Sequence, residues 1–374
     1  WLTEEATDSG QFIQAFSLWA ALTAQGQIRA AQKMIKEQRE SRAKKQKAQI
    51  TAVKEGMKAA AKEAIDGDFS YYTHVSGYLE LREAICKKFK RDNGLEYTAD
   101  EIVVSTGAKQ SIANAVLCLV NPGDEVIIPA PFWVSYLEIL KLAEGKAVFI
   151  ETDVEQDFKI NAQQLENAIT PKTRVLMMSS PCNPTGSVYS RAELKALAEV
   201  VAKHEELYII SDEIYEHINF TGKHQSIAQF DFLKDRTIII NGFSKGFAMT
   251  GWRLGYIAAP AEIAKACDKV QGQFTSGANS IAQRAGIAAL LGDLTPTYEM
   301  TRIFHQRRDK VMELLNEIPN IICDTPPAAF YMFPDVKAYF GKKTPAGEVI
   351  ANADDLCMYL LNTAHVSVVT GKAF

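Results

Sequence analysis

The sequence has no long hydrophobic run and no paired cysteine motif, and its charges nearly balance. No apolar stretch reaches the length that crosses a membrane, and no signal peptide opens the chain. The six cysteines are scattered without a C-x-x-C pair, which disfavours a zinc site or a disulfide framework and fits reduced thiols. A formal net charge of −4 argues against nucleic acid as the main partner. Together these absences favour a cytoplasmic protein.

The first fifty-odd residues differ in composition and hydrophobic pattern from the rest of the chain. Residues 29–58 lack proline and carry many lysines and arginines. They follow an apolar stripe at helical spacing, formed by Phe12, Ile13, Phe16, Trp19 and Leu22. The pattern predicts a long, mostly solvated helix, since a run of charge is usually a wet face; nucleic-acid or membrane binding is a secondary interpretation.

From about residue 100, short β-branched runs alternate with amphipathic helical stretches. At 374 residues the chain is long enough for two domains. Near-continuous apolar strands separated by helices predict an α/β fold with a mostly parallel sheet covered by helices on both faces. The expected strands are Ile102–Ser105, Glu125–Pro129, Lys146–Ile150, Arg174–Met178, Leu207–Ser211 and Thr237–Asn241, with helices at 108–120 and 132–143.

After about residue 290 the alternation stops. A long charged helix is expected at Tyr298–Ile318, followed by Phe330-Tyr-Met-Phe333. We therefore expect three parts: an atypical helical segment at 1–56, a large domain at 57–289 and a smaller α+β domain at 290–374.

Polar residues follow four of the expected strands. In open parallel sheets, ligands gather beyond the carboxyl ends of the strands, so these residues predict one site. They are Gly107-Ala-Lys109, Pro181-Cys-Asn-Pro-Thr-Gly186, Asp212-Glu-Ile-Tyr215 and Lys245.

The most informative of these strand ends is the run from Asn241 to Gly255. It sets Lys245 in a small-residue turn behind an apolar strand, with Arg253 eight positions later. Burial lowers the pKa of a lysine and favours the neutral, nucleophilic amine that forms a Schiff base. An arginine is suited to bind a phosphate. A lysine for an aldehyde and an arginine for a phosphate indicate pyridoxal 5'-phosphate (PLP); the alternative is an ordinary surface lysine.

Taken together, the motifs resemble the fold-type I PLP enzymes, and most closely the class I aminotransferases of the aspartate aminotransferase group. The resemblance runs from about Met57 to Phe374, with the motifs in family order. Besides the lysine run they are Tyr71-Tyr-Thr-His-Val-Ser-Gly-Tyr-Leu-Glu-Leu-Arg82, Ser105-Thr-Gly-Ala-Lys-Gln110, Pro129-Ala-Pro-Phe-Trp133, Asn183-Pro-Thr-Gly186 and Ser211-Asp-Glu-Ile-Tyr215.

The resemblance implies a role for each cofactor-binding residue. Asp212 holds the pyridine nitrogen protonated, and Asn183 and Tyr215 donate to the phenolic oxygen. Considered alone, Asp212 is also consistent with a residue that caps the N-terminus of a helix, and Asn183 with an ordinary turn residue. Trp133 matches the aromatic residue that stacks on the ring, and otherwise reads as a core tryptophan.

The phosphate pocket is the second group of implied residues. Backbone N–H groups where a helix opens after a strand can hold a phosphate, and the resemblance adds two side chains to them. The pocket consists of Gly107, Ala108, Lys109, Ser244 and Arg253.

The implied reaction moves an amino group between an amino acid and a 2-keto acid through a Schiff base at Lys245, which also moves the proton. Aspartate or glutamate is the expected substrate class. Tyr72 matches a tyrosine that reaches the neighbouring subunit's phosphate, which implies a homodimer with shared sites. A PLP-dependent β-lyase is the alternative reaction.

The family pattern is incomplete at both ends. The family's glycine-containing strand and turn before the Tyr72 motif is replaced by the basic stretch Gln32–Ile50, and its carboxylate-clamping Arg-x-Ser segment has no match up to Phe374. Ala328 stands where glycine is usual. These departures suggest an engineered or chimeric protein; a divergent natural homologue and a sequence that omits residues are the alternatives. They also raise the alternative of a PLP-fold scaffold with weak or no turnover.

Overall fold

The structure is a computed structural model that describes residues 55–374. The apolar stripe and the basic stretch expected near the start of the chain lie outside these described residues. Within them, no helix is both long and apolar enough to span a membrane.

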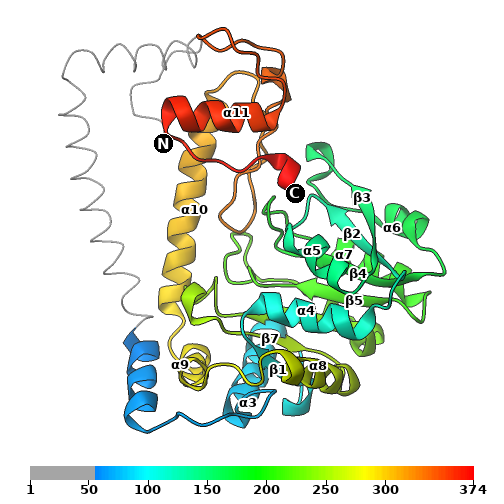
Figure 1. The fold of residues 1–374 in the computed structure, drawn as a ribbon, viewed down its shortest axis with the longest axis vertical. Helices are drawn as coiled ribbons and strands as arrows, with labels where there is room; N and C mark the ends of the chain where they lie inside the picture. Colours follow the sequence, from blue (N-terminus) through cyan, green and yellow to red (C-terminus); the bar gives the residue numbers. More distant parts are fainter. Residues whose placement is uncertain (1–54) are drawn as a thin grey trace. The chain divides into compact units, whose positions relative to one another are not determined.

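A seven-stranded sheet forms the centre of the larger part of the chain (Figure 1). Its strand order is β1-β7-β6-β5-β4-β2-β3. The strands are β1 (Ile102–Ser105), β2 (Glu125–Ala130), β3 (Lys146–Glu151), β4 (Thr173–Ser179), β5 (Tyr208–Asp212), β6 (Thr237–Gly242) and β7 (Gly255–Ala258). The pairs from β6 through β5, β4 and β2 to β3 are parallel, so the predicted mostly parallel sheet is confirmed.

Strand β7 is the one strand of this sheet that the sequence pattern did not indicate. It is only four residues long and runs antiparallel to both β1 and β6, between which it lies. Its residues Gly255-Tyr-Ile-Ala258 include a single β-branched residue, whereas β1, of the same length, has three, so the composition gives little strand signal. Its place between β1 and β6 brings the Arg253 turn to the sheet edge where the lysine turn ends.

Nine α-helices have both of their ends within the described residues, which themselves open on a helical run at 55–66. They are α3 (Leu79–Lys88), α4 (Ala108–Leu119), α5 (Ser135–Leu142), α6 (Ala162–Ala168), α7 (Arg191–Ala202), α8 (Ala261–Phe274), α9 (Ser280–Leu291), α10 (Thr295–Asn316) and α11 (Ala353–Tyr359). Helix α5 begins three residues later than expected, and α10 confirms the long charged helix.

Helices cover both faces of the sheet. Helices α4, α5 and α8 bury their apolar residues with Ile238 and Ile240, whereas α3 and α9 pack with the intervening Ile239. Helices α6 and α7 pack with Ile209 on the face opposite Ile210. This alternation follows from the two-residue period of a strand, and it explains why the strands read as continuous apolar runs.

The chain divides into two compact units. In the described residues, the sheet-containing unit comprises 55–304 and 326–331, and the second comprises 305–325 and 332–374. The second unit holds the last part of α10, helix α11, isolated β-bridges such as Ile322–Asp335, and an edge-on contact of Phe333 with Phe374. The domain ranges drawn from the sequence stay predictions.

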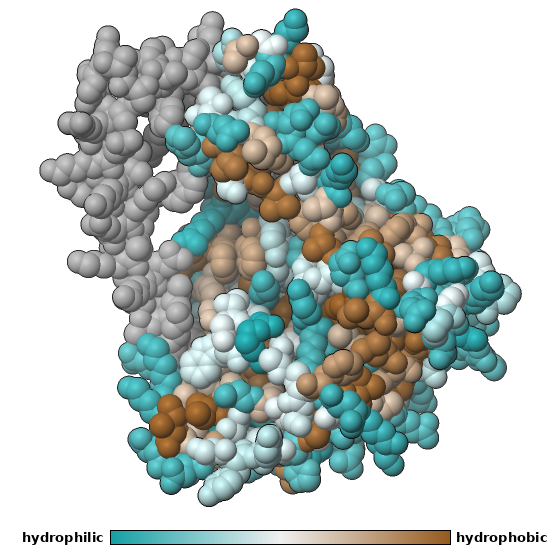
Figure 2. Space-filling view, viewed as in Figure 1, coloured by the Kyte–Doolittle hydropathy of each residue, from teal (hydrophilic) through white to brown (hydrophobic). Residues whose placement is uncertain are grey.

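On the face seen in Figure 2, the described residues carry apolar side chains in several separate areas between hydrophilic ones. The most exposed large apolar residues include Tyr71, Tyr72, Leu142 and Phe274. Single exposed apolar residues are normal in a folded protein, whereas Tyr71 and Tyr72 form an adjacent exposed aromatic pair.

Candidate active site

Five neighbouring strands bring their functional ends to one edge of the sheet. Ser179 at the end of β4 pairs with Asp212 at the end of β5, and the end of β6 pairs with the start of β7 through Gly242 and Gly255. Gly255 also pairs with Ser105 at the end of β1. The segments that follow these strands therefore start side by side, as the positions of polar residues in the sequence predicted.

Lys245 lies in the turn after β6, half-buried against aromatic rings. Its Nζ is 5.3 Å from the centre of the Tyr215 ring and 5.2 Å from that of Phe330. Burial lowers the pKa of Lys245 below that of a free lysine; the Asp212 carboxylate opposes this and the Arg253 guanidinium adds to it. The lysine thus has the environment that favours a neutral amine.

Asp212 is buried, and both of its carboxylate oxygens accept hydrogen bonds. The Tyr136 hydroxyl donates to Oδ2 over 2.8 Å, and the Ile214 backbone N–H donates to Oδ1 over 3.2 Å. Burial raises the pKa of Asp212 to about 6, although these two hydrogen bonds oppose the rise. Such a carboxylate gains from a positive partner brought close to it.

Tyr136 was not among the residues singled out from the sequence. It lies on α5, three positions after Trp133, and the two rings meet edge to face with centres 5.6 Å apart. Trp133 lies just before α5, but in the helix expected at 132–143 residues three apart share one face, and this spacing is the signal that could have found Tyr136.

Tyr215 is paired with a second residue that the sequence did not indicate, Tyr331. Their hydroxyls lie 2.5 Å apart, and Phe330 packs edge-on against the Tyr215 ring. Burial raises the pKa of Tyr215, and the neighbouring Tyr331 adds to the rise. Tyr215 therefore stays protonated and is able to donate a hydrogen bond. Tyr331 is more than a hundred residues away in the sequence, and only the fold brings it here.

The start of α4 and the Arg253 turn form a small cradle. Gly107 has a φ of +87°, and a Cβ at this position would collide with the Arg253 guanidinium. A Cβ at Gly255 would collide with the backbone of Gly107 and Ala108. Both positions thus require glycine. The guanidinium lies directly at the first N–H groups of a twelve-residue helix, which is favourable for an anion.

The remaining residues predicted for the site are placed less closely. Ser244 is half-buried beside Lys245, and exposed Lys109 has its Nζ 4.9 Å from the centre of the Trp133 ring. Asn183 is half-buried in the turn after β4. Tyr72 is 96% exposed, so within this single chain it is not enclosed by the site.

Ala328 lies against the Asn183–Gly186 turn rather than in open space. A Cβ at Gly186 would come within 2.5 Å of the Ala328 carbonyl oxygen, and Ala328 itself is buried. The alanine that replaces the usual glycine is therefore accommodated in a well-packed contact.

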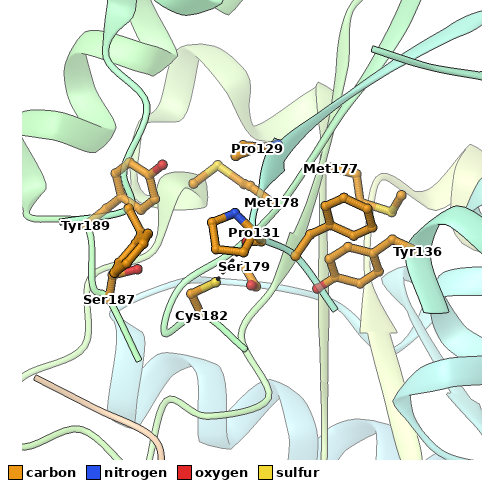
Figure 3. A pocket seen from close by; sticks show the side chains of 11 residues that line it. Pro129, Pro131, Tyr136, Met177, Met178, Ser179, Cys182, Ser187 and Tyr189 are labelled. Atoms are coloured by element: carbon orange, nitrogen blue, oxygen red, sulfur yellow. Dashed lines mark hydrogen bonds between the residues drawn. The ribbon is translucent and has the colours of Figure 1, made fainter. Parts of the chain in front are cut away.

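A small cavity of about 20 Å³ is lined in part by Tyr136, which donates to Asp212 (Figure 3). Figure 3 shows Pro131 at its centre, with Tyr136 on one side and Tyr189 on the other. A space of this volume holds about one water molecule, so it is not where a cofactor binds.

Comparisons with known proteins agree with this geometry. A family model described as aminotransferase class I and II matches residues 41–374. A bifunctional aspartate aminotransferase and glutamate/aspartate-prephenate aminotransferase from Petunia hybrida is 49% identical over 83% of this chain and 66% of that protein. A probable aspartate/prephenate aminotransferase from Rhizobium leguminosarum bv. phaseoli is 46% identical, covering 86% and 80%. The crystal structure of the aspartate aminotransferase from Rhizobium meliloti has a TM-score of 0.83 at 45% identity, covering 85% and 80%.

The sheet, its helical cover and the lysine turn define a fold-type I enzyme of the transferase class. The chain belongs to the class I and II aminotransferase family, whose PLP-dependent members move an amino group between an amino acid and a 2-keto acid. The resemblance found in the sequence is thereby confirmed. The chain spans 66% and 80% of the two relatives described above.

Proposed function

We propose that this chain binds PLP at the strand ends and transfers an amino group between aspartate or glutamate and a 2-keto acid. The observation that carries the proposal is the convergence of Lys245, Asp212 and the Gly107–Arg253 cradle at one edge of the sheet. The printed names of the relatives support the acidic substrate class, and two of them add prephenate as a keto acid to test.

The residues present fit PLP. The cradle offers a fixed cation and helix N–H groups to the phosphate, and both glycines that a Cβ would obstruct are present. Asp212 offers a buried carboxylate to the ring nitrogen, and Tyr215 and Asn183 offer donors to the phenolic oxygen. Trp133 and Ser244 complete the set of residues that would hold the cofactor.

When bound, PLP supplies an electron-withdrawing ring that stabilises negative charge at the substrate α-carbon. Lys245 is the group that takes up and returns the α-proton, because its lowered pKa leaves the amine able to act as a base. Asp212, held by Tyr136, keeps a proton on the ring nitrogen. Tyr215 stays protonated and donates its hydrogen bond.

An amino-acid panel tests this function. Aspartate or glutamate with 2-oxoglutarate, oxaloacetate or prephenate should give the exchanged pair of amino acid and keto acid. Release of ammonia and pyruvate without an acceptor keto acid would indicate a β-lyase instead. PLP binding without turnover of any pair would indicate a scaffold.

We also propose that the chain forms a homodimer in which Tyr72 reaches the partner subunit's site. Tyr71 and Tyr72 are 83% and 96% exposed next to each other, which is unusual for large aromatic side chains of a monomer. Sedimentation velocity distinguishes the dimer from a monomer.

The role of Arg253 can be isolated with PLP and pyridoxal. Hydrogen bonds to charged groups are worth about 1.5–3 kcal/mol, so Arg253→Gln should weaken PLP binding about 10- to 100-fold. Pyridoxal lacks the phosphate, and its affinity should stay near that of the parent protein. Equilibrium dialysis measures both ligands. Equal losses for both would show that Arg253 does not act on the phosphate.

A further inference from the structure

A network of charged and polar side chains is buried on the far side of the segment that carries Asp212 and Tyr215. Its central members are Glu213 and Glu216, which alternate with those two residues along the chain. Both glutamates are almost fully buried. Nothing in the proposed reaction uses them.

Glu216 is held by two side chains from outside its own segment, Lys88 and Asn93. Lys88, at the end of α3 and 1% exposed, forms an ion pair with Oε1, and the Asn93 amide donates to Oε2 over 3.1 Å. Lys88 also donates to Asn93 Oδ1 over 2.8 Å, which closes a ring of three side chains. The Gln229 amide donates to the Asn93 carbonyl and fixes that corner.

Glu213 is held just as fully. The hydroxyls of Ser226 and Ser211 donate to Oε1 over 2.6 and 3.0 Å, and His224 Nε2 lies 2.9 Å from Oε2. The backbone N–H of Glu213 also donates to Ile240 on β6. The two carboxylates thus anchor the turn at both ends.

The same turn reaches the lysine through His217. Its Nε2 lies 3.4 Å from Glu216 Oε1, and its ring packs on Phe247. A Cβ at Gly246, the residue after Lys245, would come within 2.8 Å of this ring. The segment from Asp212 to His217 therefore presses against the backbone of the lysine turn.

A buried ion pair is a poor device for stability alone. Taking both charges out of water costs about as much as their attraction returns, and apolar pairs of similar volume are often equally stable. A carboxylate with several directional partners instead fixes one geometry. Here that geometry decides where Asp212 and Tyr215 point.

We propose that Glu213 and Glu216, with Lys88, Asn93 and His224, are positioning residues that fix the turn bearing Asp212 and Tyr215. The inference rests on the proposed function of those two side chains, but it concerns residues that do not touch the cofactor. It predicts that removing the directional contacts leaves the protein folded but no longer holds Asp212 and Tyr215 in one fixed position.

The test replaces the ion pair by an apolar pair, in the variant Lys88→Met/Glu216→Met. The melting temperature should stay within about 3 °C of the parent, because the pair contributes little net stability. The PLP dissociation constant should rise about tenfold, as is usual when supports of a binding group are lost. The visible circular dichroism of each bound PLP should fall, because the ring loses its fixed orientation.

A matched control removes the same kinds of side chain from a solvent-exposed pair. Lys90 and Glu96 are 73% and 76% exposed in their side chains and 2.9 Å apart, next to α3. Lys90→Met/Glu96→Met should bind PLP like the parent. If both double variants lose affinity equally, or if the buried variant binds PLP with parental affinity and dichroism, the positioning role is refuted.

Amide hydrogen exchange separates this inference from the proposed function. In the apo protein, the amides of residues 212–218 should exchange at least about tenfold faster in the buried double variant, while those of β2 and β3 are unchanged. A parent that does not bind PLP would refute the proposed function but leave this readout intact. If the double variant does not fold, Asn93→Leu, which retains the ion pair, is measured in the same ways, and unchanged exchange and affinity overturn the proposal.

Discussion

Lys245→Ala should abolish turnover while leaving the fold intact. The side chain is half-buried in a turn that follows a complete strand, so its loss removes no core packing. It removes both the amine that bonds the cofactor and the base that moves the α-proton. Loss of a general base alone costs about 10²–10⁴-fold, so kcat/KM should fall by at least about 10³-fold.

Two measurements check this result. Adding PLP to the parent should produce a visible absorption band of the lysine-bound cofactor, and Lys245→Ala should not show it. Lys195→Ala, on the exposed face of α7, serves as the control for replacing a lysine and should behave like the parent. A variant that keeps the parental band or the parental rate would eliminate Lys245 as the reactive lysine.

The sheet could be predicted from the sequence because its signal is local. Runs such as Ile238–Ile240 are apolar without interruption, and polar residues follow them at once. Resemblance then placed Asp212 and Arg253 in the same motif order as in the family. Strand β7 was not predicted because Gly255-Tyr-Ile-Ala258 has only one β-branched residue, and its antiparallel direction depends on pairing with β1 and β6.

The supports of the site could not be predicted in this way. Tyr331 and Lys88 meet Tyr215 and Glu216 across 116 and 128 residues of sequence. Lys88 reads locally as an ordinary cation in the last turn of a helix, which is a favourable and common position. Only its near-complete burial shows that it has another role, and burial is a property of the fold.

Burial shifts the pKa values of the two central groups, Lys245 and Asp212, in opposite directions. It lowers the pKa of Lys245 and raises the pKa of Asp212, so each group is held in an environment that disfavours its charged form. A ligand with a cationic ring nitrogen and a reactive carbonyl relieves both costs. The site is therefore less stable empty than filled, and this difference is measurable.

Asp212→Asn should stabilise the apo protein above pH 6 and impair the enzyme. The carboxyl has a pKa of about 6 in the folded chain against 3.8 for a free group. Between these values the unfolded chain loses its proton first, so the parent's stability falls as pH rises and the loss is complete above about pH 6. Two pKa units correspond to about 3 kcal/mol, which the neutral asparagine does not lose.

Urea unfolding of the two apo proteins at pH 4 and pH 7.5 measures this effect. The variant should gain up to about 3 kcal/mol over the parent at pH 7.5, and the difference should nearly vanish at pH 4. With PLP present, the more stable variant should be the less active protein, because an amide cannot hold the ring nitrogen protonated. Its kcat should be about 10²–10⁴-fold below that of the parent. A difference in stability that does not change with pH would show that burial does not raise the pKa of the Asp212 carboxyl. Unimpaired turnover would show that Asp212 does not act on the cofactor.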